Sequence, residues 1–482
     1  MAKEKKKKEL GITAEKDDFS EWFTELMLKA DLADYSEVSG CMILKPRSYA
    51  IWEKIKEECD KRFKKLGIKN CYFPLFIPER FLEKEKAHVA GFSPEVAWVT
   101  HGGNKKLNER LAVRPTSETI MYPAFARWIR SWRDLPLRLN QWNNVVRWEF
   151  RHPVPFFRTR EFLWNELHTV LASEQEALEE GKLLLDIYLD VCENCLALYG
   201  IVGKKTELEK FAGGVASWKI HYILPNGKII EGPCFHYDGQ NFAKAFGIKF
   251  LNKEGKQQYA YQNTYAISTR MLGTMFAIHA DDKGVILPPK LAPNKIVIIP
   301  IYTKENKEEV LKKASEIEKI LKDFDAFVDL REEHTPGYKF NDWELKGIPL
   351  RIEIGQREIE SRQVVLVRRD TCQKEVIKIS ELVKKVNLAL EEIQKTLLER
   401  SKKMFEEKLV EVDSIDGLIK AVKDKKAGII PLCKNSECEE KLKEITNGIK
   451  AVCIIEEKKV KAERCLVCGK RADYFVLAGK TY

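Results

Sequence analysis

The stretch NQWNNVVRWEFRHPVPFFRTREFLWNELHT, residues 140–169, limits the folds that this chain can adopt. In its part VVRWEFRH (145–152), charged residues alternate with apolar and aromatic ones, which predicts a β-strand with Arg147, Glu149 and Arg151 on one face. Two further arginines follow within the stretch. Because a guanidinium makes paired hydrogen bonds to phosphate or carboxylate, this concentration of arginine indicates an anion site. Ordinary surface pairs of Arg with Glu, which contribute little stability, are the alternative.

The composition is that of a folded protein with several domains. The chain has 482 residues, 44% of them apolar and 32% charged, which suits about three globular domains and excludes a disordered chain. Its net charge of +10 permits a polyanionic partner without requiring one. No run of about 18 apolar residues occurs, so we expect no membrane-spanning helix. The basic start MAKEKKKKEL lacks a following apolar stretch, so we expect no secretory signal, a flexible basic tail over 1–17 and a cytoplasmic location.

The pattern of the sequence changes twice along the chain. The proline-rich segment ILPPKLAP (286–293) predicts a linker. The strand–helix–strand alternation that follows it predicts a small α/β domain with parallel strands. A long charged helix over about 380–407 then leads into a last region that contains five of the twelve cysteines. Helical periodicity predicts three earlier helices, at about 18–30, 49–66 and 173–197.

Four of those five cysteines predict a metal site. They form two close pairs about 30 residues apart, the layout of a tetrahedral four-thiolate zinc site, and Gly469 favours a tight turn after the second pair. Burial of four small side chains without metal is the alternative. Burial in the core explains Cys453 better than metal binding does. The same holds for Cys192 and Cys195, which lie in an apolar helical stretch. The predicted zinc ligands are Cys433, Cys438, Cys465 and Cys468.

The sequence contains no glycine-rich phosphate loop, so a bound nucleotide would have its phosphates held by arginines. Together with RPTSE (114–118) and STRMLG (268–273), the opening stretch resembles the signature motifs of class II aminoacyl-tRNA synthetases, specifically the archaeal/eukaryotic-like prolyl-tRNA synthetase family. The composition of CYFPLFIP (71–78) predicts an edge strand or a strand end. The segment is similar to motif 1, which in this family forms the homodimer interface around its proline, here Pro74.

The resemblance extends from about residue 18 to the end and implies three domains. They are a catalytic domain with an antiparallel sheet flanked by helices (18–287), an α/β anticodon-binding domain (288–400) and a zinc-binding α+β domain (401–482).

The resemblance also implies a two-step reaction. The carboxylate of L-proline attacks the α-phosphate of ATP, which carries Mg²⁺, and the prolyl group then passes to the 3′ end of tRNA(Pro). A proline-sized pocket also admits alanine and cysteine, because a small apolar pocket separates such side chains by only about 1–3 kcal/mol. Only about 100 residues separate Thr169 from Ser268, so we expect no editing domain in the chain.

The family motifs imply a role for each of several residues. The catalytic residues are Arg147 and Arg270. The proline-binding residues are Thr116, Glu118, Arg147, Trp164, His168, Phe211 and His236. The ATP-binding residues are Arg147, Glu149, Arg158, Thr159, Glu231, Cys234, Ser268 and Arg270. The anticodon-reading residues are Glu344, Arg351, Arg357 and Glu358, with Lys374 less clearly matched, and the terminal Tyr482 is directed toward the catalytic site.

One stretch departs from the family pattern. Where the family has a sequence close to Q-G-A-T-S-H, this chain has EGPCFH (231–236), so Glu231 and Cys234 replace a Gln and a Thr. A carboxylate cannot donate a hydrogen bond and a thiol donates poorly, so we expect altered contacts to ATP. Two other identities are possible in principle. A threonyl-type relative needs a Cys and two His around a catalytic zinc, and no such set lies near VVRWE. A tRNA-binding or regulatory paralogue that kept the fold but lost activity would typically lack the motif arginines, whereas Arg147 and Arg270 are present.

Overall fold

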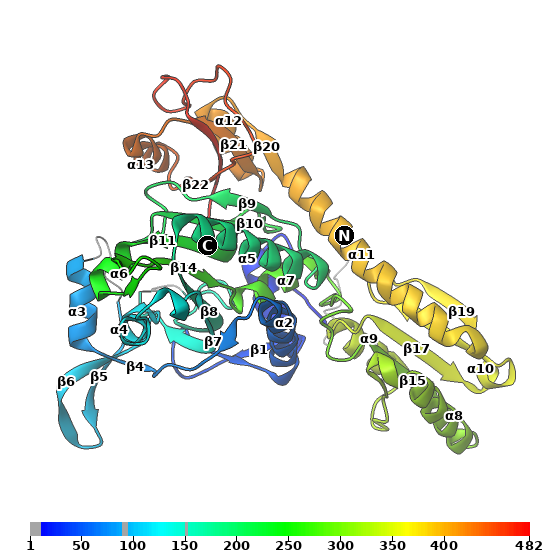
Figure 1. Cartoon of the computed structure of the whole chain (residues 1–482). Coiled ribbons are helices and arrows are strands. Elements are labelled where there is room, and N and C mark those ends of the chain that lie inside the picture. The colour runs from blue at the N-terminus through cyan, green and yellow to red at the C-terminus, as the bar shows by residue number, and fades with distance from the viewer. Residues whose placement is uncertain (1–10, 89–94, 150–152) are drawn as a thin grey trace.

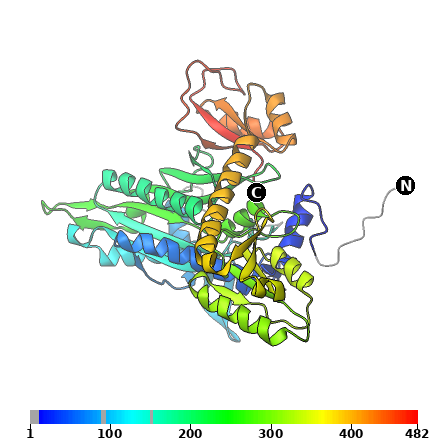
Figure 2. The ribbon, with the colours of Figure 1, turned by 90° about the vertical axis from the view of Figure 1, so that its right-hand side faces the viewer.

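The computed structural model of the chain describes residues 11–88, 95–149 and 153–482. The first ten residues of the expected basic tail, and Arg151, lie outside these ranges. Figure 1 shows a large catalytic body, a smaller α/β domain beside it and a C-terminal domain above it, and the long helix α11 (Leu382–Lys408) connects the last two. Figure 2 shows the same helix running from the α/β domain up to the C-terminal domain. The helix extends through the expected boundary at residue 400.

The centre of the catalytic body is an antiparallel sheet, as the family resemblance implied. Neighbouring strands in the order β9-β10-β11-β14-β8-β7 pair antiparallel throughout. The three predicted helices pack their apolar faces into one core with the sheet. The strands are β7 (Leu137–Val146), β8 (Glu161–Leu171), β9 (Ile201–Lys204), β10 (Ala216–Ile223), β11 (Ile229–Gly239) and β14 (Tyr261–Ala266), and β3 (Lys69–Asn70) is added parallel to β7. The helices are α1 (Phe19–Lys29), α2 (Pro46–Lys65), α4 (Glu118–Trp128), α5 (Glu174–Asn194) and α7 (Arg270–His279).

The stretch quoted first forms the hairpin of β7 and β8, but the predicted strand face is wrong in part. Strand β7 ends at Val146, so Arg147 and Glu149 lie in the connection beyond it rather than on the strand. Beyond Val146 the backbone changes partner, since the N–H of Trp148 donates to the carbonyl oxygen of Glu95 over 3.0 Å rather than to β8. The end of the strand aims Arg147 across the sheet, toward the cavity described below.

The segment CYFPLFIP is a strand only in its last part. Residues 71–75 have no regular structure, consistent with the missing N–H of Pro74, and β4 begins at Phe76. Strands β4 (Phe76–Pro78), β6 (Lys105–Val113) and β5 (Trp98–Gly102) form a separate three-stranded sheet. The other short elements of the catalytic body are β1 (Ala33–Tyr35), β2 (Met42–Leu44), α3 (Glu79–His88), α6 (Asn241–Phe246), β12 (Lys249–Leu251) and β13 (Gln257–Tyr259).

The α/β domain has a mixed sheet, so the prediction of parallel strands is correct only for the first three. Strand β15 pairs parallel with β16 and β17, but β17 pairs antiparallel with β18, and β18 with β19. The seven residues between β17 and β18 are too few for the crossover of about a dozen that a parallel pair needs. The expected linker 286–293 is not loose, because most of it is buried between this domain and the catalytic core. The elements are β15 (Ile296–Ile301), α8 (Lys307–Ile320), β16 (Ala326–Val328), α9 (Pro336–Leu345), β17 (Leu350–Gly355), α10 (Gln356–Glu360), β18 (Gln363–Arg368) and β19 (Lys374–Lys378).

The C-terminal domain extends the catalytic sheet. Its strand β22 meets β9 through the pair Ile454 and Lys204, which joins the two into one eleven-stranded sheet. The chain then ends against the catalytic body, where Ile229 N donates to Lys480 O over 2.8 Å. The elements are β20 (Leu409–Glu411), α12 (Ile415–Lys423), β21 (Ala427–Leu432), α13 (Ser436–Ile445), β22 (Lys450–Ile454) and β23 (Tyr474–Gly479).

Candidate functional site

A cavity of about 410 Å³ opens over the central strands of the catalytic sheet. Every residue that the motifs assigned to proline or ATP lines it, although these residues come from segments far apart in the sequence. Lining residues that were not anticipated include Phe162, Glu166 and Lys219. The anticipated lining residues are Thr116, Glu118, Arg147, Glu149, Arg158, Thr159, Trp164, His168, Phe211, Glu231, Cys234, His236, Ser268 and Arg270.

Arg147 is held at the wall of this cavity by a carbonyl oxygen and two aromatic rings. Its Nε donates to the carbonyl oxygen of Pro115 over 3.1 Å. Its guanidinium carbon lies 5.4 Å and 5.3 Å from the ring centroids of Phe162 and Trp164, within the range of cation–π attraction. A carbonyl oxygen and aromatic rings orient the guanidinium without forming an ion pair with it, so its charge favours an anionic ligand.

Arg270, the first residue of α7, is held in the same way. Its Nε donates to the carbonyl oxygen of Phe157 over 3.1 Å and its Nη1 to the carbonyl oxygen of Glu231 over 3.2 Å. Burial lowers the pKa of Arg270, and the nearby charges of Arg147 and Arg158 lower it further, against the opposing effect of the Glu231 charge. Three guanidinium groups that line one cavity are suited to a polyanion such as a triphosphate. The structure therefore does not support the alternative of plain surface Arg–Glu pairs.

The other end of the cavity carries buried carboxyl groups. Glu118, at the start of α4, is 3% exposed and accepts a short hydrogen bond from Thr116. Burial, and then the charge of Glu166, raise the pKa of Glu118 to about 7. Glu166 itself accepts from the backbone N–H of Ser117 (2.9 Å) and from the side chain of Asn143 (2.8 Å). Because Glu166 is satisfied by these donors, Glu118 is the carboxyl suited to a ligand's ammonium group.

Two histidines beside these carboxyls are neutral. Burial lowers the pKa of His236 to about 3 and that of His168 to about 4. His236 shares its Nδ1 with Ser217 Oγ at 2.7 Å, and its ring lies 4.7 Å from the ring of Phe211. This leaves Nε2 of His236 for a ligand, beside an aromatic wall.

The two positions that depart from the family pattern have clear surroundings. The carboxylate of Glu231 accepts from Lys205 Nζ and from Lys219 Nζ, both over 2.7 Å. Burial raises the pKa of the Cys234 thiol, which is therefore neutral. Glu231 is thus engaged by two lysines that no sequence motif singled out, because the pairing of β10 with β11 and the position of β9 bring them together.

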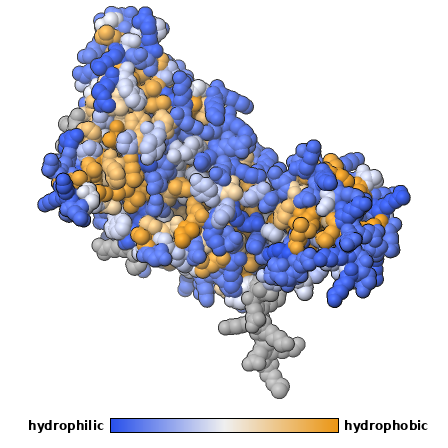
Figure 3. All heavy atoms as spheres, turned by 90° about the horizontal axis from the view of Figure 1, so that it is seen from below, coloured by the Kyte–Doolittle hydropathy of each residue, from blue (hydrophilic) through white to orange (hydrophobic). Residues whose placement is uncertain are grey.

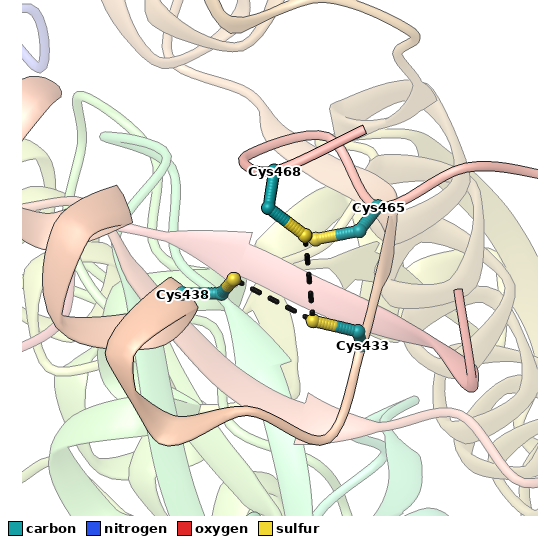
Figure 4. A group of neighbouring side chains, drawn as sticks. All are labelled: Cys433, Cys438, Cys465 and Cys468. Atoms are coloured by element: carbon teal, nitrogen blue, oxygen red, sulfur yellow. Dashed lines mark hydrogen bonds between the residues drawn. The ribbon is translucent and has the colours of Figure 1, made fainter. Parts of the chain in front are cut away.

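The four predicted zinc ligands form one cluster in the C-terminal domain (Figure 4). Their sulfur atoms lie within 4.8 Å of one another, and Cys433 Sγ is 3.5 Å from Cys438 Sγ and 3.8 Å from Cys468 Sγ. A tetrahedral ion with Zn–S bonds of about 2.3 Å places its sulfur ligands about 3.8 Å apart, so this donor set fits zinc. Gly469 has φ +70°, the left-handed conformation that the tight turn after the second pair was expected to need. Cys192, Cys195 and Cys453 are buried, as expected for packing.

The residues expected to read an anticodon are partly engaged within the α/β domain. Arg351 is buried and pairs with Glu344 (3.0 Å) and with Glu353 (2.9 Å), which Lys374 also contacts (3.1 Å). Glu358 accepts from the backbone N–H of Gly355 and so caps α10, while Arg357 is exposed.

Tyr482 lies one side chain away from the cavity. Its ring stacks on Phe157, which lines the cavity, with centroids 4.8 Å apart, and its hydroxyl accepts from Asn226. Among the described residues, no helix is long and apolar enough to cross a membrane.

Comparison with known proteins agrees with this architecture. The sequence profile for the "tRNA synthetase class II core domain (G, H, P, S and T)" matches residues 98–279, that for the "Anticodon binding domain" matches 295–388, and that for "Prolyl-tRNA synthetase, C-terminal" matches 415–482. A "Proline–tRNA ligase" of Natranaerobius thermophilus is 44% identical over 96% of this chain and 95% of its own length. A "Putative proline–tRNA ligase" of Saccharomyces cerevisiae is 43% identical over 98% of this chain and 73% of its own length.

The crystal structure of a related protein agrees with these sequence matches. The prolyl-tRNA synthetase of Cryptosporidium parvum, solved in complex with halofuginone and AMPPNP, superposes with a TM-score of 0.93 at 44% identity, covering 98% of this chain and 100% of that one. Full-length identity of this order, shared across three domains, confirms the family that the motifs indicated. The chain belongs to the class II prolyl-tRNA synthetase family, of the archaeal/eukaryotic-like type.

Proposed function

We propose that this protein activates L-proline with ATP and transfers the prolyl group to the 3′ end of tRNA(Pro). The observation that carries the proposal is the cavity itself, in which the guanidinium groups of Arg147, Arg158 and Arg270 line the same space as the buried carboxyl of Glu118. Such a site suits a ligand pair with a polyphosphate and an ammonium group. The related Cryptosporidium enzyme was crystallised with an ATP analogue, which supports a nucleotide in the equivalent cavity.

In the first step, a carboxylate oxygen of proline forms a bond to the α-phosphorus and the bond from that phosphorus to the β-phosphate oxygen breaks, releasing pyrophosphate. Arg147 stabilises the charge that accumulates on the α-phosphate, and Arg270 and Arg158 hold the outer phosphates. Glu118 holds the secondary ammonium of proline, and the ring lies against Phe211, Trp164 and His236. No general base is required, because the carboxylate of proline is already ionised near neutral pH.

Magnesium would accompany ATP and neutralise charge on its outer phosphates. Of the carboxylates that line the cavity, Glu231 is held by two lysines, whereas Glu149 is exposed. Glu149 is therefore the lining carboxylate that fits a metal ligand.

The second step places the tRNA over two domains. The α/β domain would read the unpaired anticodon bases through Glu344, Arg351, Arg357 and Glu358, since single-stranded bases expose their edges. The ion pairs of Arg351 with Glu344 and Glu353 would then have to rearrange or act as a preformed hydrogen-bonding surface.

Selectivity for proline would depend on the cavity in which the amino acid is activated. The described residues between Thr169 and Ser268 form α5, α6 and strands of the catalytic body, which supports our expectation that the chain has no editing domain. We therefore expect alanine and cysteine to be activated as well, because a small pocket excludes them weakly.

The quaternary structure and the metal complete the proposal. Exposed aromatic side chains lie near Pro74: Tyr72 and Phe76 flank it in the sequence, Trp98 is on β5 in the same small sheet as Phe76, and the ring of Trp128 lies 5.8 Å from that of Phe73. Figure 3 shows apolar side chains gathered in patches on the lower face of the molecule. This surface suits the homodimer interface of the family. The four cysteines would hold a structural zinc ion that links α13 to the loop before β23.

The test is ATP–pyrophosphate exchange by the purified protein with proline, alanine, cysteine or threonine. Exchange should be fastest with proline, detectable with alanine and cysteine, and absent with threonine. Exchange that depends on threonine rather than proline would reject the assignment, and no exchange with any of the four would favour an inactive paralogue.

A further inference from the structure

A buried lysine connects the cavity to the C-terminal domain. Lys205 directly follows β9 and its side chain is 1% exposed. Its Nζ donates to Glu231 Oε1 over 2.7 Å and to the carbonyl oxygen of Val452, on β22, over 2.6 Å. One ammonium group thus joins the strand that lines the cavity, β11, to a strand of the C-terminal domain.

The neighbours of Lys205 repeat this connection. Thr206 donates to Glu439 Oε2 over 2.7 Å, and Glu209 pairs with Lys450 over 2.9 Å. The same segment continues into residues 209–212, which line the cavity. Three contacts therefore fix one wall of the cavity against the C-terminal domain.

Glu231 links Lys205 to residues that line the cavity. Its second carboxylate oxygen accepts from Lys219 Nζ over 2.7 Å, and its carbonyl oxygen accepts from Arg270. Lys219 lines the cavity, with its side chain 20% exposed. Without the carboxylate, two lysines beside Arg270 would repel one another and the arginine, because like charges in a partly buried site are costly.

We propose that Lys219 is a nucleotide-binding residue and that Lys205 is a positioning residue, which acts through Glu231 and ties the phosphate-binding wall to the C-terminal domain. In this arrangement Glu231 does not contact ATP but sets the place of Lys219 and supports Arg270. The departure from the family pattern at residue 231 is then one half of a charge pair whose other half is Lys219. The inference rests on the proposed function, because it assumes that the arginine-lined part of the cavity takes ATP.

The experiment measures the KM for ATP and for proline in pyrophosphate exchange, together with the thermal midpoint. Lys219→Met should raise the KM for ATP by about tenfold, the loss of one charge-assisted contact, and leave the KM for proline within about twofold. Lys205→Met should raise the KM for ATP by about three- to tenfold, although its side chain does not line the cavity. Lys204→Met is the matched control, since the Lys204 ammonium lies over the Trp218 ring instead of on Glu231 and should change neither constant.

A double substitution separates positioning from a general loss of structure. Glu231→Gln combined with Lys205→Met should raise the KM for ATP no more than the more severe single change, because both act through the same pair. Additive effects, KM values for ATP and proline that rise together with a lowered thermal midpoint, or a KM for ATP within about twofold of wild type in Lys219→Met would each overturn the inference. If the wild-type protein shows no proline-dependent exchange, the proposed function falls and this inference with it; if exchange is normal and the variants respond like Lys204→Met, only this inference falls.

Discussion

Replacing Glu118 by Gln should remove the pH dependence of proline binding near neutrality. Glu118 is buried beside Glu166, and these two effects raise its pKa to about 7. Below that pH the free protein carries a neutral Glu118 carboxyl group, which must lose its proton before it can pair with the ammonium of proline. The affinity for proline should therefore fall as the pH falls, and at a pH one unit below the pKa it should be about tenfold below its plateau.

The substitution also has a pH-independent cost. A hydrogen bond to a charged group contributes about 1.5–3 kcal/mol, so Glu118→Gln should weaken proline binding at pH 8 by about 10- to 150-fold. The assay is calorimetric titration with proline without ATP, which avoids the titration of the nucleotide phosphates. Glu207→Gln, at a carboxylate that is 78% exposed, is the matched control and should follow the wild-type curve. Wild-type affinity that is constant from about pH 6 to pH 8, or a pH dependence that persists in Glu118→Gln, would refute the reasoning.

Four further predictions follow from the same geometry. Arg147→Ala should lower kcat/KM in pyrophosphate exchange by at least about 100-fold, since two charge-assisted bonds of about 1.5 kcal/mol or more are lost, and a drop below tenfold would speak against its role. Asp238→Leu should raise the free energy of unfolding in urea by about 1–3 kcal/mol at neutral pH. Burial raises the pKa of Asp238, so the stability of the wild-type protein falls as the pH rises from the pKa of the unfolded state toward that of the folded state. The stability gained by the substitution should therefore shrink at acid pH. Deleting Thr481 and Tyr482 removes the ring that stacks on Phe157 and should slow adenylate formation by about three- to tenfold, whereas unchanged kinetics would exclude that support. Cys433→Ser should lower both the zinc content, from about one ion per chain, and the thermal midpoint, and a wild-type protein without zinc would reject the metal site.

The motifs predicted the site better than the local structure around it. Arginines and carboxyls that carry chemistry stand at fixed spacings in the sequence, so their convergence on one cavity could be anticipated from the family resemblance. Their placement on strands could not, because β7 ends where the backbone of Trp148 pairs with Glu95, a residue far away in the sequence. The four cysteines were recognisable for a simpler reason, since tetrahedral ligation constrains the spacing within each pair.

Contacts between segments far apart in the chain could not be predicted from the sequence. Lys205, Lys219 and Glu231 meet only because β9, β10 and β11 pair in one register, and a shift of one residue would turn Lys219 to the opposite face. Glu166 lies within a recognised motif, yet only the structure shows that it is satisfied by donors from other segments and so raises the pKa of Glu118. The antiparallel return of β18 likewise followed from the length of a connection rather than from the apolar pattern of the strand.

A crystal structure with proline and a non-hydrolysable ATP analogue would show directly whether the arginine-lined cavity binds ATP and proline. We expect the triphosphate within hydrogen-bonding distance of Arg147 and Arg270, and the proline nitrogen on the carboxylate of Glu118. A nucleotide bound elsewhere, with these guanidiniums still held by the carbonyl oxygens of Pro115, Phe157 and Glu231, would contradict this expectation.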